Sequence, residues 1–250
     1  MTVAEVLLLF AAGVGGGLAG SIAGLASVST YPALLLIGLP PVTANVTNTV
    51  ALVFNGVGSV AGSLPELRLQ RDLLKRFVPV GVAGGAAGAA LLLMIPSEGF
   101  EAAVPVLLAA SALVIAVPHR KDAEPVPPST TKSILIAAAL FAICVYGGFF
   151  GAAAGVLMLA LFLRVGARSL ADANATKNVV LGVANLVAAV IFAVLSPVVW
   201  SAAAPMALGC LIGARLGSIV VRRAPAGPLR LLIAAAALGL AIKLGYDTYR

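Results

Sequence analysis

The stretch YGGFFGAAAG, residues 146–155, lies in the middle of an apolar run over 133–163, longer than the roughly 20 residues that one membrane-spanning helix needs. Basic residues flank this run on both sides: Arg120, Lys121 and Lys132 before it, and Arg164 and Arg168 after it. Because Lys and Arg mark cytoplasmic loops, both flanks are expected on the same side. The run is therefore predicted to enter and return, as a helical hairpin or a broken re-entrant pair, with glycine permitting the bend.

A second run of this kind occupies residues 4–38 near the start of the chain. It carries GGGLAGSIAG at 15–24, with Pro32 beyond. The length of the run and its glycines are similar to those of the first, so a second broken hairpin is predicted here.

The overall composition is that of an integral membrane protein. Of the 250 residues, 61% are hydrophobic and 10% are charged, with a mean hydropathy of +1.11, whereas a soluble domain has about 25% charged residues. Short alternating strands are absent from the pattern, so the fold class is predicted as an all-α polytopic membrane protein. The net charge of +7 sits mainly in short loops and marks the cytoplasmic side, so no nucleic-acid partner is expected.

Each half of the chain is predicted to be a hairpin followed by three crossings. The crossings are expected at 43–63, 75–95 and 101–117 in the first half, and at 172–195, 199–220 and 229–247 in the second. Because three crossings is an odd number, the second half would start on the opposite side of the membrane from the first. The two halves would then have inverted topology, with a binding site at their interface. This arrangement gives an N-terminal repeat 1–117, a cytoplasmic linker 118–132 and a C-terminal repeat 133–250. Both termini are then extracytoplasmic, and hydropathy would count about eight to ten spans.

Weak internal similarity supports a duplication. The matches keep nearly one offset: Gly16, Gly20 and Gly24 with Gly147, Gly151 and Gly155 at 131; Ala44, Asn45 and Thr47 with Ala173, Asn174 and Thr176 at 129; Gly84 and Gly88 with Gly213 and Gly217 at 129. Together, and in order, they indicate an internal repeat.

Two apolar segments carry matched polar stripes at helical spacing. The first stripe is Asn45, Asn48, Leu52, Asn55 and Ser59, and the second is Asn174, Lys177, Asn178, Gly182 and Asn185. Hydrogen bonds between helices are one interpretation, and groups facing a substrate are the other, because an ionisable side chain within a span usually faces a cavity or partner. Lys177, and also Arg215 in a later span, lie near predicted inner ends and could instead extend to the interface.

The charged and catalytic residue types point away from an enzyme and towards an anion. Every carboxylate falls in a loop or near a span end, and the only histidine, His119, lies in the linker. Intramembrane protease chemistry and a carboxylate relay therefore lack their residues. Cys144 and Cys210 lie alone in apolar runs, so neither a metal nor a cofactor is expected. Half-helix N-termini at the hairpin tips would suit a small anion.

Two stretches resemble the sulfite exporter TauE/SafE family, also called TSUP. SIAGLASVSTYPALLLIGLPPVTANVTNT at 21–49 is similar to its first repeat, and GGFFGAAAGVLMLALFLRVGARSLADANATKNVV at 147–180 to its second. The chain departs from the family's patterns at Gly24-Leu25-Ala26-Ser27, where the family has a glycine cluster, and at Ala153, where glycine is usual. The resemblance implies transport of sulfite, organosulfonates or related sulfur or carboxylate anions across the plasma (inner) membrane.

We therefore expect a secondary transporter of small anions that exports by alternating access. The residues expected to line the substrate site are Asn45, Thr47, Asn48, Asn55, Asn174, Thr176, Lys177 and Asn178, with Gly24, Ser27, Gly151 and Gly155 from the hairpins. Two alternatives stay open: a non-transporting membrane scaffold or assembly protein, and a passive anion channel. The expected partners are the anion and the lipid bilayer, while a homodimer and the coupling ion, H⁺ or Na⁺, are left open.

Overall fold

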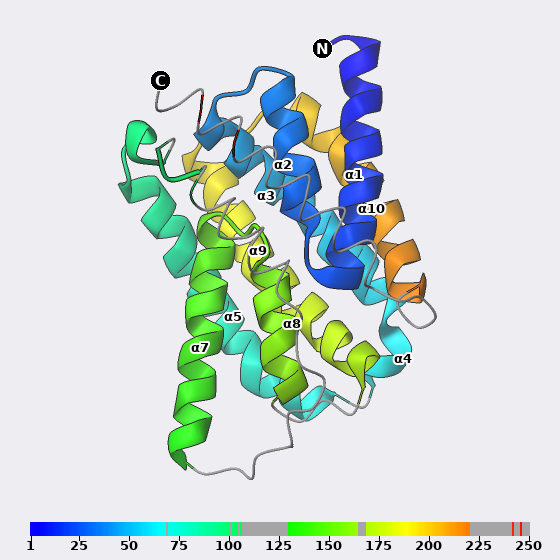
Figure 1. Cartoon of the computed structure of the whole chain (residues 1–250), viewed down its shortest axis with the longest axis vertical. Helices are drawn as coiled ribbons and strands as arrows, with labels where there is room; N and C mark the ends of the chain where they lie inside the picture. Colours follow the sequence, from blue (N-terminus) through cyan, green and yellow to red (C-terminus); the bar gives the residue numbers. More distant parts are fainter. Residues whose placement is uncertain are drawn as a thin grey trace.

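The structure is a computed structural model that describes residues 1–68, 70–100, 102–104, 106, 130–164, 169–220, 242 and 246. Within these residues the chain forms helices and no strands, as the sequence predicted. The helices are α1 (Val3–Ala23), α2 (Ala26–Leu36), α3 (Pro41–Gly62), α4 (Leu64–Leu67), α5 (Arg71–Met94), α7 (Thr130–Phe149), α8 (Ala154–Arg164), α9 (Leu170–Leu195) and α10 (Trp200–Val220). Figure 1 shows them as one bundle of long and short helices.

The first broken hairpin is formed by α1 and α2 and turns at Gly24. Gly24 has φ +76°, a left-handed conformation that glycine adopts without a Cβ penalty, and its N–H donates to Gly20 O at 2.8 Å. With 21 residues α1 is about 31 Å long, whereas the 11 residues of α2 span about 16 Å. The hairpin therefore has one arm long enough to cross the hydrocarbon and one that returns about halfway.

The second hairpin, α7 and α8, repeats this long and short pattern with 20 and 11 residues. Its break contains Gly151 at φ +76° and Ala153 at φ +61°, and the Tyr146 hydroxyl donates across it to Ala152 O at 2.8 Å. The prediction of a return within YGGFFGAAAG is confirmed. Because α7 begins at Thr130, the last residues assigned to the linker 118–132 belong to this helix.

Four described helices are long and apolar enough to cross a membrane: α1, α5, α9 and α10. The 22-residue α3 is as long, but its polar stripe keeps it out of this set. Helices α3, α5, α9 and α10 match the predicted spans 43–63, 75–95, 172–195 and 199–220, and α5 starts four residues early, at Arg71. The predicted spans 101–117 and 229–247 lie almost wholly outside the described residues.

Each long hairpin helix packs against a helix from the other half of the chain. Gly13 and Gly17 of α1 lie against the backbone of α10. Gly209 and Gly213 of α10 in turn lie against the backbone of α1. In the same way, Gly84 and Gly88 of α5 lie against α7, around Cys144 and Val145. The absence of side chains at these glycines lets the backbones approach closely. The contact α1–α10 thus corresponds to the contact α7–α5, as expected of two related halves. The inverted topology of the two halves stays a prediction.

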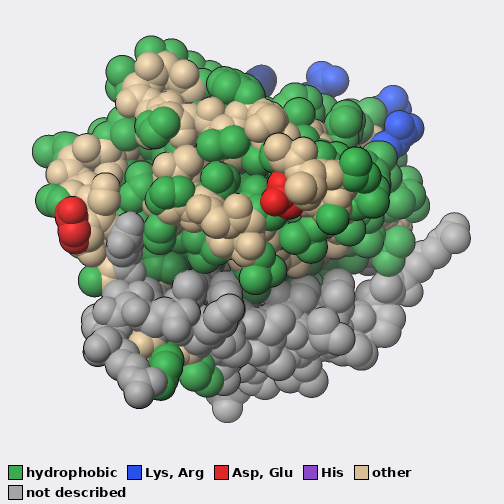
Figure 2. Space-filling model, turned by 90° about the horizontal axis from the view of Figure 1, so that it is seen from above, with side chains coloured by type: hydrophobic (Ala, Val, Ile, Leu, Met, Phe, Trp, Pro, Cys, Tyr) green, Lys and Arg blue, Asp and Glu red, His purple; other side chains and the backbone are tan. Residues whose placement is uncertain are grey.

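Several of the described basic residues gather at one end of the bundle. Figure 1 places the start of α1 and the ends of α5 and α9 at one end, and the starts of α5, α7 and α9 at the other. The start of α7 and the end of α8 thus share an end, as the hairpin argument requires. Figure 2 looks at the end where α1 begins; it shows two acidic groups among apolar atoms, with Lys and Arg at one edge only. The described residues Arg68, Arg71, Lys75 and Arg76 flank or begin α5 at the opposite end.

Candidate functional site

The candidate site lies where both hairpin breaks and the two polar helices meet. Gly24 of the first hairpin and Gly155 of the second touch backbone to backbone, so that a Cβ on either would overlap the other. These are two of the glycines that the offset of 131 pairs. Nearby, Gly56 of α3 and Gly182 of α9 let these helices cross closely. Small residues therefore draw four elements, two from each half, to one point.

Two matched asparagines tie each half to the hairpin of the other. Asn45 on α3 donates its side-chain amide to Phe149 O at the end of α7, at 2.8 Å. Asn174 on α9 donates to Ser21 O in the last turn of α1, at 2.7 Å. Both carbonyls belong to helix C-terminal turns, where carbonyl groups lack helical partners. We call this pair of bonds the reciprocal clasp.

Lys177 belongs to the same junction but does not reach solvent or the interface. Its side chain is 1% exposed, and Nζ donates to Gly20 O at 3.0 Å and Ser21 O at 3.4 Å. No described carboxylate pairs with it. The ammonium instead donates hydrogen bonds to carbonyls in the last turn of α1, which is the negative end of that helix. By contrast, Arg215 is exposed on α10, and its extension to the interface stays a prediction.

Most of the other polar residues predicted for the site on α3 and α9 bond to their own helix or to a neighbouring one. Asn48 donates to Ser27 Oγ at 3.3 Å and accepts from the Thr30 hydroxyl, which fixes α2 against α3. Thr47 Oγ1 accepts from Val199 N at 3.1 Å, next to the start of α10. Thr176 donates to Asp172 O within α9 at 3.0 Å, and Asn178 is buried with its Nδ2 unpaired.

A small cavity opens beside the hairpin breaks. Its lining combines hairpin residues with α3 and α9: Gly20, Gly24, Ala26, Ser27, Thr49, Leu52, Asn55, Gly147, Phe150, Gly151, Leu181 and Asn185. The centre of a water-sized sphere can occupy about 20 Å³ of it, where a single water needs about 10 to 15 Å³. In this conformation the cavity has room for one or two water molecules.

Four of the residues predicted for the site line this cavity: Gly24, Ser27, Asn55 and Gly151. The remaining eight do not line it; they take part in the reciprocal clasp, in the Lys177 contact or in contacts within and between helices. Two polar lining residues, Thr49 and Asn185, were not predicted as site residues. Asn185 had a usable signal, because it lies two turns from Asn178 on the same stripe. Thr49 had none, since it sits beside the stripe and also bonds its own helix at Asn45 O.

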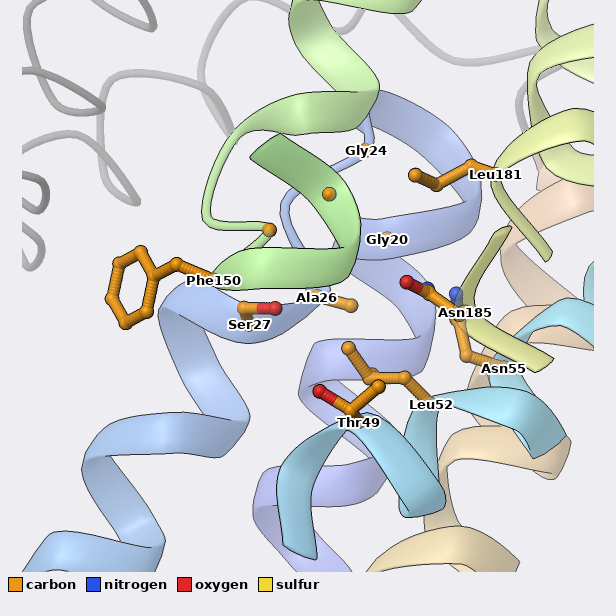
Figure 3. A pocket seen from close by; sticks show the side chains of 12 residues that line it. Gly20, Gly24, Ala26, Ser27, Thr49, Leu52, Asn55, Phe150, Leu181 and Asn185 are labelled. Atoms are coloured by element: carbon orange, nitrogen blue, oxygen red, sulfur yellow. The ribbon is translucent and has the colours of Figure 1, made fainter. Parts of the chain in front are cut away.

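The polar groups of the cavity are amides and hydroxyls. Figure 3 shows Ser27, Thr49, Asn55 and Asn185 around the space next to Gly20. The amides of Asn55 and Asn185 make no hydrogen bond to any described residue, and Asn55 Oδ1 is buried. None of the described lining residues is charged. Such a lining can donate hydrogen bonds to a small ligand, and it offers no general acid, base or nucleophile pair. Among the described residues, no group of His, Cys, Asp and Glu could hold a metal.

Helices long and apolar enough to cross a membrane, two broken hairpins and a cavity between them are typical of a multi-pass membrane protein of the transporter class. The chain belongs to the sulfite exporter TauE/SafE family, whose model matches residues 9–244. This confirms the resemblance seen in the two hairpin motifs.

The names of similar proteins agree with this class. The chain is 30% identical to a probable membrane transporter protein, ORF9, of Sinorhizobium sp, over 96% of this chain and 92% of the relative. It is 24% identical to the probable membrane transporter protein YfcA of Escherichia coli (strain K12), over 93% and 87%. A probable membrane transporter protein of Haemophilus influenzae is 26% identical over 96% and 94%. No solved structure matches the chain. Family and relatives indicate a membrane transporter rather than an enzyme.

Proposed function

We propose that this protein is a secondary transporter that exports small anions, namely sulfite, organosulfonates or related sulfur and carboxylate anions, across the plasma membrane. The observation that carries the proposal is the cavity between the two hairpin breaks, lined by Ser27, Asn55 and Asn185 with no described charged side chain. Sulfite comes from the name of the family, and the related sulfur and carboxylate anions come from the resemblance described in the sequence analysis.

The geometry around the cavity favours alternating access. Both halves contribute a hairpin break and a polar helix to one central point, the arrangement in which one half can rock against the other around a fixed site. The reciprocal clasp gives each half a bond to the opposite hairpin, so a change at one hairpin acts on the other half. The basic residues before and in the first turns of α5 favour an orientation with that end in the cytoplasm. The start of α1 then faces outward.

Flux through proteoliposomes that hold only the purified protein tests the proposal. Vesicles loaded with sulfite, taurine or sulfoacetate should release at least one of them faster than empty-membrane controls. Release that saturates with concentration supports a transporter, whereas non-saturating conductance in single-channel recording indicates a passive channel.

The scaffold alternative has its own measurement. A transporter should gain thermal stability in detergent by about RT ln(1 + [L]/Kd) when it binds an anion L. A scaffold should show neither this stabilisation nor flux with any anion of the panel, and that pair of results would contradict the proposal.

A further inference from the structure

We propose that the cavity selects a singly charged anion, which it holds through uncharged amide and hydroxyl groups, while Lys177 supplies its positive charge from behind the carbonyls of α1. This inference rests on the proposed function and deepens it. It names the charge state of the ligand and separates the groups that touch it from the group that does not.

Each of the groups available for contact keeps a hydrogen-bond donor that no described residue uses. Asn185 is 8% exposed, lines the cavity and makes no hydrogen bond to a described residue. Asn55 lies against Gly20, and its Nδ2 donates to no described residue, so this amide N–H is free to donate to an anion. Ser27 is 4% exposed and accepts from Asn48, so its own hydroxyl proton stays available. A buried donor without a partner is unfavourable, and an anion in the cavity would accept hydrogen bonds from these donors.

Two helix ends also meet the cavity, and they carry opposite signs. α2 begins at Ala26 with no side-chain cap, so its free N–H groups place a positive end beside Ser27. α1 ends there too, and its negative end would repel an anion. The carbonyls of Gly20 and Ser21 are, however, taken up by Lys177 and Asn174. Lys177 therefore cancels the repulsive helix end and leaves the attractive one.

The charge count then favours one negative charge on the ligand. In its protonated form Lys177 supplies one buried positive charge without a described carboxylate partner, and the described cavity lining contributes no charge. A monoanion makes the buried assembly neutral. A dianion would leave one negative charge in excess, which is costly in a low-dielectric interior. Asp172, the acidic residue of α9, is one turn and a half before Lys177 and bonds Ser169 at the exposed helix start.

Three ligands of similar shape separate the charge states: dimethyl sulfone with none, methanesulfonate with one and sulfate with two negative charges. Each is added as a competitor of sulfite flux in proteoliposomes that hold the full chain. Methanesulfonate should inhibit at a concentration about tenfold or more below that of sulfate. Equal or stronger inhibition by sulfate would overturn the inference while leaving the proposed function intact; absence of any sulfite flux would count against the proposed function itself.

Variants of Lys177 separate its charge from its hydrogen bonds. Lys177→Gln keeps a donor for the α1 carbonyls but removes the charge, so inhibition by methanesulfonate should weaken about tenfold while that by dimethyl sulfone stays within about twofold. A purely structural role would weaken both ligands alike, and that result would contradict the inference.

Matched serines test the contacts. Ser27 and Ser218 are both buried, at 4% and 2% exposure, but only Ser27 lines the cavity. Ser27→Ala should weaken methanesulfonate inhibition severalfold, as should Asn185→Leu, whereas Ser218→Ala should match the wild type. If Asn185→Leu does not fold, the serine pair decides. Equal effects of the two serine variants would show that the cavity is not the contact site.

Discussion

Asn174 and Ser21 are 153 positions apart in the chain, yet the amide of the first donates to the carbonyl of the second at 2.7 Å in a buried setting. Its counterpart, the bond from Asn45 to Phe149 O, joins the same two kinds of element in the opposite direction. The polar stripes of α3 and α9 therefore hold the hairpins of the opposite halves in place. The cavity is shaped by the hairpin ends that these bonds fix.

Breaking the reciprocal clasp should cost stability. Asn174→Ala removes the donor to Ser21 O in a buried site, so the free energy of unfolding should fall by about 1 to 3 kcal/mol. A thermal melt of the purified protein in detergent measures this change. Thr176→Ala, which removes a bond to Asp172 O within the same helix, should lower the melting temperature much less. A clasp variant that melts like the wild type would show that the bond does not hold the hairpin.

The contact between Gly24 and Gly155 should tolerate no added methyl group. Gly155→Ala places a Cβ against the Gly24 backbone, and such overpacking costs about 1 to 3 kcal/mol. Gly15 in α1 has no atom within 4 Å of an added Cβ. Gly15→Ala should therefore be neutral, or stabilise by up to about 1 kcal/mol through helix propensity. Thermal melts of the two variants should move in opposite directions or differ clearly; identical shifts would argue against the close approach.

Ala153 should be improved by glycine. It holds φ +61°, which costs an L-residue roughly 1 to 2 kcal/mol. Ala153→Gly should relieve this strain and, after the entropy that glycine adds to the unfolded chain, raise the free energy of unfolding by up to about 1 kcal/mol. Ala152→Gly, at a buried neighbour without a left-handed φ, should instead destabilise. If Ala153→Gly also lowers the melting temperature, the break is not strained there.

The hairpin topology can be mapped by cysteine labelling. After the buried cysteines Cys144 and Cys210 are replaced by alanine, single cysteines are placed as Ser133→Cys, Leu170→Cys and Ser97→Cys. An impermeant thiol reagent should label the first two from the same side of the membrane and the third from the other. Labelling of Ser133→Cys and Leu170→Cys from opposite sides would refute the returning hairpin.

The sequence predicted the hairpins from features within and beside each apolar run. Basic loops on both sides of a run that is too long for one helix require a return, and glycine marked the place of the turn. The structure puts the second turn at Gly151 to Ala153, inside the quoted stretch. Helix ends were less accurate: α7 and α5 both begin earlier than predicted, because the first turns carry basic or hydroxyl residues that hydropathy reads as loop.

The sequence predicted which helices carry polar residues towards the hairpin breaks, but not what those residues contact. Asn45, Asn174 and Lys177 were expected to face the ligand, and each instead donates to a backbone carbonyl of the opposite half. Helical spacing shows which residues share a face, but not which partner lies across that face. Only the tertiary contact of α9 with the end of α1 reveals that Lys177 serves a helix terminus, and that Asn185 is left free to meet a ligand.

The measurement that tests the central claim most directly is an experimental structure of the full chain with bound methanesulfonate. The account predicts density for the anion between the two hairpin breaks, within hydrogen-bond distance of Ser27, Asn55 and Asn185, with Lys177 still on the carbonyls of Gly20 and Ser21. Density on the Lys177 ammonium itself, away from the cavity and with those carbonyls released, would contradict it.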